Sequence, residues 1–321
     1  MEDKKMFDTE LHIHLEGVTD ATLLKKIYDG NSISINLKDI KKLYSSIKSF
    51  DDFIGIYTLI VQGVRKSDDI MLMFDNIGKY FGKNGITYSE ILVSPTLFTG
   101  ELPGQKQVFS IKDIIQIYED GAEYLIDKYN VEAYLIIDGI RGLGPEPLLK
   151  VLKWLEKICP KRIIGISLGG QETSKPPEDF TWAFSVARAT GLHCLCHLGE
   201  FGDAGWIQHN LKVLLPERIG HGINACNSPA LLDYIITNDI GVDMTITGNL
   251  LLGALADYSS HPLRKMIRSG VAVTLNSDDP GIFNTGLCQE VRIARSRLGL
   301  TDDDILTLAK NSKQTRFKNK K

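Results

Sequence analysis

The sequence predicts an α/β protein built as a single (β/α)8 TIM-type barrel. Eight short apolar, β-branched runs recur along the chain, and longer amphipathic segments separate them. Eight is the number of parallel strands that closes such a barrel. An open doubly wound sheet is the alternative, but no Gly-x-Gly-x-x-Gly motif follows the first run.

The expected strands are rich in branched apolar residues, as in parallel sheets that helices cover. In chain order they are Phe7–Ile13, Ile86–Val93, Glu132–Ile137, Arg162–Leu168, Leu192–His197, Arg218–His221, Gly241–Ile246 and Val271–Asn276. Helical segments between them are expected at Ile111–Tyr129, Glu146–Ile158, Asp179–Thr190, Ala230–Thr237 and Pro262–Ser269. Strands and helices therefore alternate through most of the chain.

A long interval, from Leu15 to about Gly85, separates the first two expected strands. It contains a helix whose apolar side chains exceed a single core-facing stripe: Phe53, Ile54, Tyr57, Leu59, Ile60 and Val61. Either neighbouring elements bury this helix, or its spare apolar face covers a ligand at the barrel mouth. The predicted fold therefore includes a helical lid insertion after the first strand.

The composition is that of an ordinary globular protein, with 321 residues, 43% of them hydrophobic and 24% charged. Length alone suggests about two domains, but α/β barrels often reach this size as one domain. No repeat or linker divides the chain. Residues 1–321 are therefore expected to form a single domain.

The charge balance argues against a polyanionic partner. The formal net charge is −3 and the isoelectric point is near 6.2, which disfavours nucleic acid or an anionic membrane as the main partner. No apolar stretch reaches the length of a membrane span, and the charged start Met1–Lys5 does not resemble a signal peptide. We expect a cytoplasmic protein that acts on a small molecule, and the sequence leaves its oligomeric state open.

Two histidines, His12 and His14, lie at the end of the first expected strand. Residues two apart on a strand point to the same face, so both imidazoles face the same way. Such a pair supplies half of a metal site. Taken alone, it also fits a strand that carries two histidines without a chemical role.

Other expected strands end in residues of the same chemical kind. His197 and Glu200 follow the fifth strand, His221 ends the sixth, and Asp278 and Asp279 follow the eighth. In barrels of this type the active site lies at the C-terminal ends of the strands, so these side chains converge on one rim. Three histidines and a carboxylate suit a borderline divalent cation. The fourth strand ends without a lysine or carboxylate to bridge two metals, which favours a site for one.

Five segments, taken in chain order, resemble the adenosine/adenine deaminase family of metal-dependent amidohydrolases. They are Glu10-Leu11-His12-Ile13-His14-Leu15-Glu16-Gly17, Leu168-Gly169-Gly170-Gln171-Glu172, His197-Leu198-Gly199-Glu200, Arg218-Ile219-Gly220-His221-Gly222 and Leu275-Asn276-Ser277-Asp278-Asp279-Pro280. The closing Asn311-Ser312…Phe317 also resembles the family's final helix. Each segment alone is a modest match, but the ordered set is highly specific and covers essentially the whole chain.

The resemblance implies one Zn²⁺ per chain and assigns its ligands. By motif position, these ligands are His12, His14, His197 and Asp278. Zinc lowers the pKa of a bound water to about 7, which supplies a nucleophile at neutral pH.

The resemblance also assigns the proton chemistry and the substrate contacts. Glu200 protonates the purine at N1, while His221 orients the attacking water and helps to deprotonate it. Asp279 hydrogen-bonds this nucleophile and purine N7, and the backbone N–H of Gly170 contacts N3. Glu16 contacts the 5′ end of the sugar. A glutamate acts as such an acid only where a dry, apolar pocket raises its pKa.

Two departures from the family pattern bear on the substrate. The family often has Cys-Pro-x-Ser-Asn after the seventh strand, but this chain has Thr245-Ile246-Thr247-Gly248-Asn249 and keeps only the asparagine. We expect this change to alter the shape of the pocket rather than to remove activity. Nucleoside-specific members often have aspartate where this chain has Glu16. The longer acid suggests a different group at the 5′ end.

The implied reaction converts adenosine or 2′-deoxyadenosine to inosine or 2′-deoxyinosine and releases ammonia. The string Gly165–Glu172, followed by Pro176-Pro177, resembles the aminodeoxyfutalosine-deaminating branch. A 5′-modified adenosine such as 6-amino-6-deoxyfutalosine is therefore the alternative substrate. Free adenine ranks lower, because adenine-specific members have Ser-Glu in place of Gly-Gln-Glu. A catalytically silent nucleoside- or partner-binding relative is a remote alternative, since the metal-binding and proton-transfer residues are all present.

Overall fold

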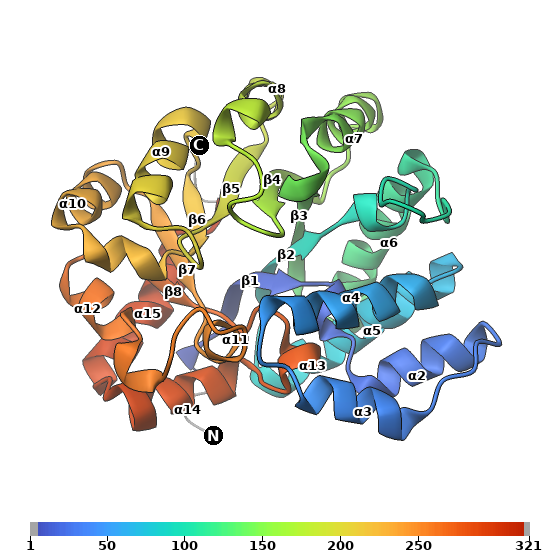
Figure 1. Cartoon of the computed structure of the whole chain (residues 1–321), viewed down its shortest axis with the longest axis horizontal. Helices are drawn as coiled ribbons and strands as arrows, with labels where there is room; N and C mark the ends of the chain where they lie inside the picture. The colour runs from blue at the N-terminus through green and yellow to red at the C-terminus, as the bar shows by residue number, and fades with distance from the viewer. Residues whose placement is uncertain (1–5, 318–321) are drawn as a thin grey trace.

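The computed structural model describes residues 6–317, which form a nearly closed (β/α)8 barrel (Figure 1). Residues 1–5 and 318–321 of the predicted domain lie outside the described part. Each of the eight parallel strands pairs with the next along the chain. The strands are β1 (Thr9–His14), β2 (Tyr88–Val93), β3 (Glu132–Ile140), β4 (Ile163–Gly169), β5 (His193–Leu198), β6 (Arg218–His221), β7 (Gly241–Met244) and β8 (Val273–Leu275). Every predicted strand is confirmed; β6 has the predicted ends, and the ends of the other strands shift by a few residues.

Helices ring the strands and cover the outside of the barrel (Figure 1). Between β2 and the C-terminus they are α6 (Ile111–Tyr129), α7 (Pro145–Ile158), α8 (Thr181–Ala189), α9 (Ala204–Leu214), α10 (Pro229–Thr237), α11 (Thr247–Leu251), α12 (Leu263–Arg268), α13 (Pro280–Phe283), α14 (Leu287–Leu298) and α15 (Asp302–Gln314). The predicted helix Asp179–Thr190 begins instead as the 3-10 turn Pro177–Phe180, which leads into α8. No helix within residues 6–317 is both long and apolar enough to cross a membrane.

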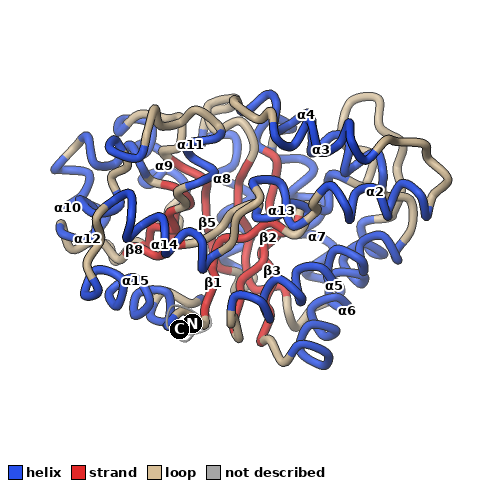
Figure 2. Tube along the Cα trace, turned by 90° about the horizontal axis from the view of Figure 1, so that it is seen from below, coloured by secondary structure: helices blue, strands red, loops and turns tan. Residues whose placement is uncertain are grey.

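The interval after β1 contains four α-helices rather than the single predicted one. They are α2 (Ala21–Gly30), α3 (Leu37–Ser45), α4 (Phe50–Gly63) and α5 (Ser67–Asn84). Side chains cap several of their N-termini: for example, Asp20 accepts hydrogen bonds from two backbone N–H groups of α2, at 2.8 Å each. Figure 2 shows α4 at the end of the barrel opposite the two chain termini.

The barrel interior is filled separately from the main core between strands and helices. One interior group contains Leu11, Tyr88 and Tyr134, and a second contains Leu92, Ile136, Leu195 and Phe317. The strands of the first half are buried on both faces, because the helices cover them outside and these side chains fill them inside. Phe317, which follows α15, reaches into this interior from the C-terminal end of the chain.

A fully buried arginine holds the interior together below the barrel mouth. Arg218, the first residue of β6, pairs with Glu90 at 2.7 Å and with Asp243 at 2.5 Å, and none of these side chains is exposed. The guanidinium also lies 4.1 Å from the centre of the Phe317 ring. The same strand ends in His221, so this ion cluster fixes a strand that carries a candidate site residue.

The barrel closes between β8 and β1 through a short seam rather than a regular ladder. The Asp278 N–H donates to the His12 carbonyl at 3.1 Å, and the His14 N–H donates to the Asp278 carbonyl at 2.9 Å. Below them, the side-chain oxygen of Asn276 accepts the N–H groups of Leu11 and His12, at 2.9 and 3.2 Å. The seam therefore places Asp278 directly beside the two histidines of β1.

We expect Arg218→Met to destabilise the protein by roughly 3–5 kcal/mol, because it leaves the Glu90 and Asp243 carboxylates buried without their cation. The free energy of unfolding from a denaturant titration measures this loss. Arg292→Met is the matched control: Arg292 lies on the surface of α14 and bonds only Gln289 among the described side chains. A loss below about 1 kcal/mol for Arg218→Met would contradict the role assigned to the cluster.

Candidate active site

A cavity of about 250 Å³ lies at the C-terminal ends of the strands. Its polar wall consists of His14, Ser94, Asp138, Gly170, Glu172, His197, Glu200, His221, Asp278 and Asp279. Its apolar wall comes largely from α4, which contributes Phe50, Phe53, Ile54, Tyr57 and Val61. Of the predicted site residues, all except His12 and Glu16 line this cavity. The α4 helix occupies the covering position that a lid would need.

The four predicted metal ligands lie together: His14, His197 and Asp278 line the cavity, and His12 is buried beside them. The Nε2 atoms of His14 and His197 are 3.2 Å apart. The Nε2 atoms of His12 and His14 lie 3.5 and 3.6 Å from Asp278 Oδ1. His12 and Asp278 group with His14 as potential ligands, and His12 groups also with His197 and His221. The geometry thus brings His221 into the same cluster, although the sequence assigns it to orient water.

The state of these side chains fits a metal ion. Neither ring nitrogen of His12 has a hydrogen-bond partner among the described residues, although the side chain is fully buried. Burial lowers the pKa of His14 to about 3 and that of His197 well below its usual value, so both imidazoles stay neutral as metal ligands must. Burial opposes ionisation of Asp278, but the imidazole of His12 and the other nearby imidazoles hold the pKa of this carboxyl well below its usual range.

Two site residues hold their side chains in place through unusual backbone angles. Asp278 and His221 have φ values of +66° and +64°, a region that residues other than glycine rarely adopt. Close packing of the cluster also requires a glycine at Gly220, where a Cβ atom would lie 2.5 Å from the His12 ring. The backbone therefore accepts strain to bring these side chains together.

Glu200, His221 and Asn249 form the second part of the polar wall. The Asn249 amide donates to Glu200 Oε1 at 2.9 Å and lies 3.1 Å from His221 Nδ1. Burial raises the pKa of Glu200 to about 7, so the protonated acid is available near neutral pH. Burial opposes protonation of His221, but the Glu200 and Asp278 carboxylates outweigh it and raise the pKa of this imidazole.

Asp279 links the polar floor to the covering helix. Burial and the adjacent Asp278 carboxylate raise the pKa of Asp279 well above its usual value. The Tyr57 hydroxyl of α4 donates to Asp279 Oδ1 at 2.7 Å. On the same helix, Phe53 stacks on Phe283 of α13, with ring centres 5.4 Å apart. The position of α4 is therefore tied to a predicted catalytic residue.

The predicted substrate-binding residues differ in their surroundings. Gly170 lines the cavity with φ at +81°, a conformation that favours glycine. Glu16 lies outside the lining, fully buried, and accepts hydrogen bonds from the Ser94 N–H at 3.1 Å and the Tyr118 hydroxyl at 3.4 Å. Burial raises the pKa of Glu16 to about 7. Its predicted contact with the sugar stays a prediction.

Sequence reasoning did not assign a role to two acids that line the cavity. Glu172 accepts the N–H groups of Gly199, Phe201 and Gly202 at 2.6–2.9 Å and so holds the loop that carries Glu200. Asp138 lies near the end of β3 beside His197. Each was detectable as an acid at a strand end, the signal that singled out Asp278.

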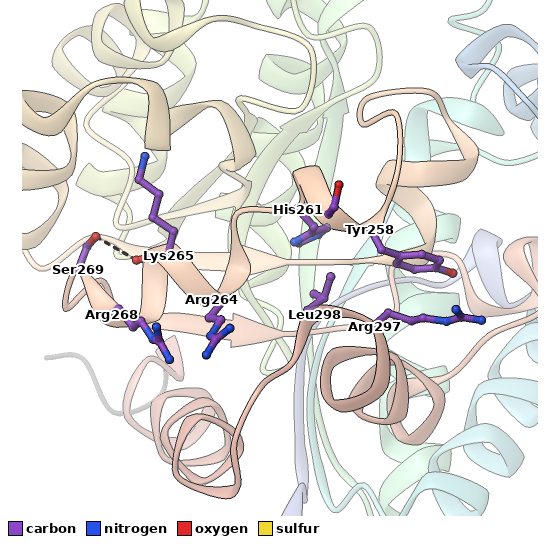
Figure 3. A pocket seen from close by; sticks show the side chains of 9 residues that line it. Tyr258, His261, Arg264, Lys265, Arg268, Ser269, Arg297 and Leu298 are labelled. Carbon is purple, nitrogen blue, oxygen red and sulfur yellow. Dashed lines mark hydrogen bonds between the residues drawn. The ribbon is translucent and has the colours of Figure 1, made fainter.

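A second hollow, of about 500 Å³, lies on the outside of the barrel beside α12 and the end of α14. It is rich in cations, but Figure 3 shows Lys265 pointing away from Arg264 and Arg268. Arg297 extends along the ring of Tyr258. These cations do not converge on one point, and the chemistry-bearing cluster of the described chain is the one at the barrel mouth.

The sequence comparisons agree with this geometry. The family model described as adenosine deaminase matches residues 8–321. An aminodeoxyfutalosine deaminase from Acidothermus cellulolyticus is 29% identical over 91% of this chain and 82% of the relative. An adenine deaminase from Sinorhizobium fredii is 30% identical over 96% of this chain and 93% of the relative.

Solved structures share the fold. An adenine deaminase from Arthrobacter aurescens superposes with a TM-score of 0.89 at 24% identity, covering 96% of this chain and 93% of that one. An amidohydrolase from Burkholderia ambifaria with bound zinc gives a TM-score of 0.87 at 21% identity, covering 98% and 87%. The chain therefore belongs to the adenosine deaminase family and is a hydrolytic deaminase of the metal-dependent amidohydrolase type.

Proposed function

We propose that this chain is a cytoplasmic, zinc-dependent deaminase of a 6-aminopurine nucleoside, with adenosine or 2′-deoxyadenosine as substrate. The observation that supports this most directly is the convergence of Glu200, Asp279 and the metal-ligand cluster on one wall of a single cavity. The opposite wall is apolar and aromatic, as a flat heterocycle requires. The reaction replaces the C6 amino group with oxygen and releases ammonia.

Glu200 and Asp279 each have a protonation state suited to the proposed task. The acid form of Glu200 donates to N1 and disperses the charge that develops on the ring during attack at C6. Asp279 has a raised pKa, so it holds a proton to donate to N7, which is a hydrogen-bond acceptor. His221 accepts a proton from the attacking water, and the Gly170 N–H donates to N3. The Asn249 amide contacts both Glu200 and His221 and so fixes the position of each side chain relative to the other.

The cavity floor fits one zinc ion. We propose that His12, His14, His197 and Asp278 hold it, because three neutral imidazoles and one ionised carboxylate are its preferred kinds of ligand. The zinc, when bound, supplies Lewis-acid activation of water at neutral pH. The relative crystallised with bound zinc supports this choice of metal.

A 5′-modified adenosine is the second candidate substrate. Thr58, Val61 and Leu102 line the catalytic cavity and also an adjoining outer groove of about 820 Å³. The charged residues lining that groove, Arg65 and Lys106, are both cations. An acidic substituent attached to the 5′ carbon of the sugar would extend into this groove. It would contact apolar residues first and the two cations beyond them. The relative named aminodeoxyfutalosine deaminase supports this candidate.

A substrate panel tests the proposal. The purified zinc-loaded protein is assayed with adenosine, 2′-deoxyadenosine, 5′-deoxyadenosine, adenine and 6-amino-6-deoxyfutalosine, by ultraviolet absorbance and ammonia release. We expect kcat/KM for a nucleoside to exceed that for adenine by about tenfold or more, because sugar contacts lower the transition-state free energy. A preference for aminodeoxyfutalosine selects the second candidate. A preference for free adenine, the substrate in the names of several relatives, would overturn the nucleoside assignment.

Glu200→Gln should keep the metal and lower kcat/KM by about 10²-fold or more, because the amide has no acidic proton for N1. In the parent, Glu200 is protonated at pH values below its raised pKa of about 7, and it loses this proton as the pH rises through that value. The parent pH profile should therefore fall above about pH 7, and the variant profile should lack this limb. Glu178→Gln, which removes a surface acid paired with His209, is the control. An unchanged rate in Glu200→Gln would remove Glu200 from the mechanism.

His197→Ala should lower zinc occupancy well below that of the parent, since it removes one of four ligands. Metal content after dialysis, measured by atomic emission, reports the change. His209→Ala removes a half-exposed histidine and should retain the parental zinc content. Full occupancy in His197→Ala would rule out His197 as a ligand.

A further inference from the structure

Asp138 is a buried acid beside the metal-ligand cluster that the proposed reaction does not use. It lies near the C-terminal end of β3 and is 5% exposed. Its Oδ1 atom has no hydrogen-bond partner among the described residues and lies 3.8 Å from His197 Nδ1. An unpaired buried carboxylate oxygen is costly, so its retention here calls for an explanation.

Ser167 stands between this acid and the histidine. It is the residue of β4 that pairs with Asp138 in the sheet register, and it is fully buried. Its hydroxyl oxygen lies 3.3 Å from His197 Nδ1, and the register of β3 and β4 places it beside the Asp138 side chain. A hydroxyl accepts one hydrogen bond while it donates another, so Ser167 can join the imidazole to the carboxylate.

The neighbouring backbone leaves space for the carboxylate. A Cβ atom at Gly169 would lie 2.5 Å from Asp138 Oδ2, so a larger residue there would displace the acid. The Gly169-Gly170 pair therefore has a second use besides close approach to a ligand: it makes room for Asp138 next to His197.

The proposed zinc site determines what His197 needs from these residues. Its Nε2 atom faces Nε2 of His14 at 3.2 Å, the side on which the metal would lie. An imidazole that binds metal through Nε2 carries its proton on Nδ1 and requires an acceptor there. Ser167, with Asp138 behind it, is placed to provide that acceptor.

We propose that Asp138 is a positioning residue that acts through Ser167 to fix the tautomer and ring orientation of His197 for zinc binding. The inference rests on the proposed role of His197 as a metal ligand. Asp138 also lines the cavity, so direct contact with the substrate is the competing explanation, and the experiment is designed to separate the two.

Zinc affinity is measured by competition with a chelator for the parent, Asp138→Ala, Ser167→Ala and Ser167→Thr. We expect Asp138→Ala and Ser167→Ala to bind zinc about 10–100-fold more weakly, the usual effect of removing such a partner. Ser167→Thr keeps the hydroxyl and should retain near-parental affinity. Ser89→Ala removes another fully buried serine hydroxyl, on β2, and serves as the control.

Two further readouts separate positioning from other roles. Thermal unfolding of the metal-free proteins detects a purely structural defect, which would lower stability without a matching loss in zinc affinity. The visible spectrum of cobalt-substituted protein should change in Asp138→Ala, because it reports the geometry at the metal. Parental zinc affinity and cobalt spectrum in Asp138→Ala would overturn the inference, and a raised KM with unchanged zinc affinity would identify a substrate contact instead. If the parent binds zinc but deaminates no purine, the proposed function fails while the affinity series still decides the role of Asp138.

Discussion

The site depends on the seam where β8 meets β1. The C-terminal ends of β1 and β8 are far apart in the sequence, yet two backbone hydrogen bonds around Asp278 bring this carboxylate beside His12 and His14. Asn276 fixes the register of the seam by accepting two N–H groups of β1 with one oxygen. Because a parallel strand that slips by one residue turns every side chain to the other face, a shift at this seam would separate Asp278 from the two histidines. The hydrogen bonds that close the barrel between β8 and β1 therefore also bring the side chains of the cluster together.

Burial then sets the chemistry of the assembled groups. Exclusion of water raises the pKa of Glu200 and Asp279 and lowers that of His14 and His197. The same exclusion of water therefore favours protonated acids and neutral imidazoles next to one another on one wall of the cavity. The α4 helix maintains it from above, and its Tyr57 hydroxyl is bonded to Asp279. Movement of this helix would admit water to the cavity and shift the pKa values of the acids and of the imidazoles together.

The sequence predicted the fold and the chemistry-bearing strand ends well, because both follow from local patterns. Apolar runs separated by helical periodicity indicate the strands, and polar residues just beyond those runs mark the barrel mouth. It did not single out Arg218, since an arginine at a strand start gives no sign that two distant carboxylates will bury it. Asp138 was detectable as an acid at a strand end, but its position beside Ser167 follows from the register between β3 and β4, which the sequence pattern does not give. The helices α2, α3 and α5 were not predicted, although α5 buries Ile70, Phe74, Ile77 and Phe81 at helical spacing.

The substrate is harder to derive than the reaction for a physical reason. Relatives named for adenine and for aminodeoxyfutalosine are similar to this chain to almost the same degree, at 30% and 29% identity. Attack at C6 requires the same kind of cavity floor for both substrates, so the chemistry of the floor does not discriminate between them. In the proposed binding mode, a group attached at N9 meets the α4 side chains and the segment around Leu102 at the border of the outer groove, so these residues would discriminate between substrates. Glu16 lies outside the lining, and its carboxylate accepts the backbone N–H of Ser94, which lines the cavity just beyond β2. This hold on the end of β2 and the predicted contact with the sugar are two separate routes by which the acid at position 16 bears on the proposed specificity.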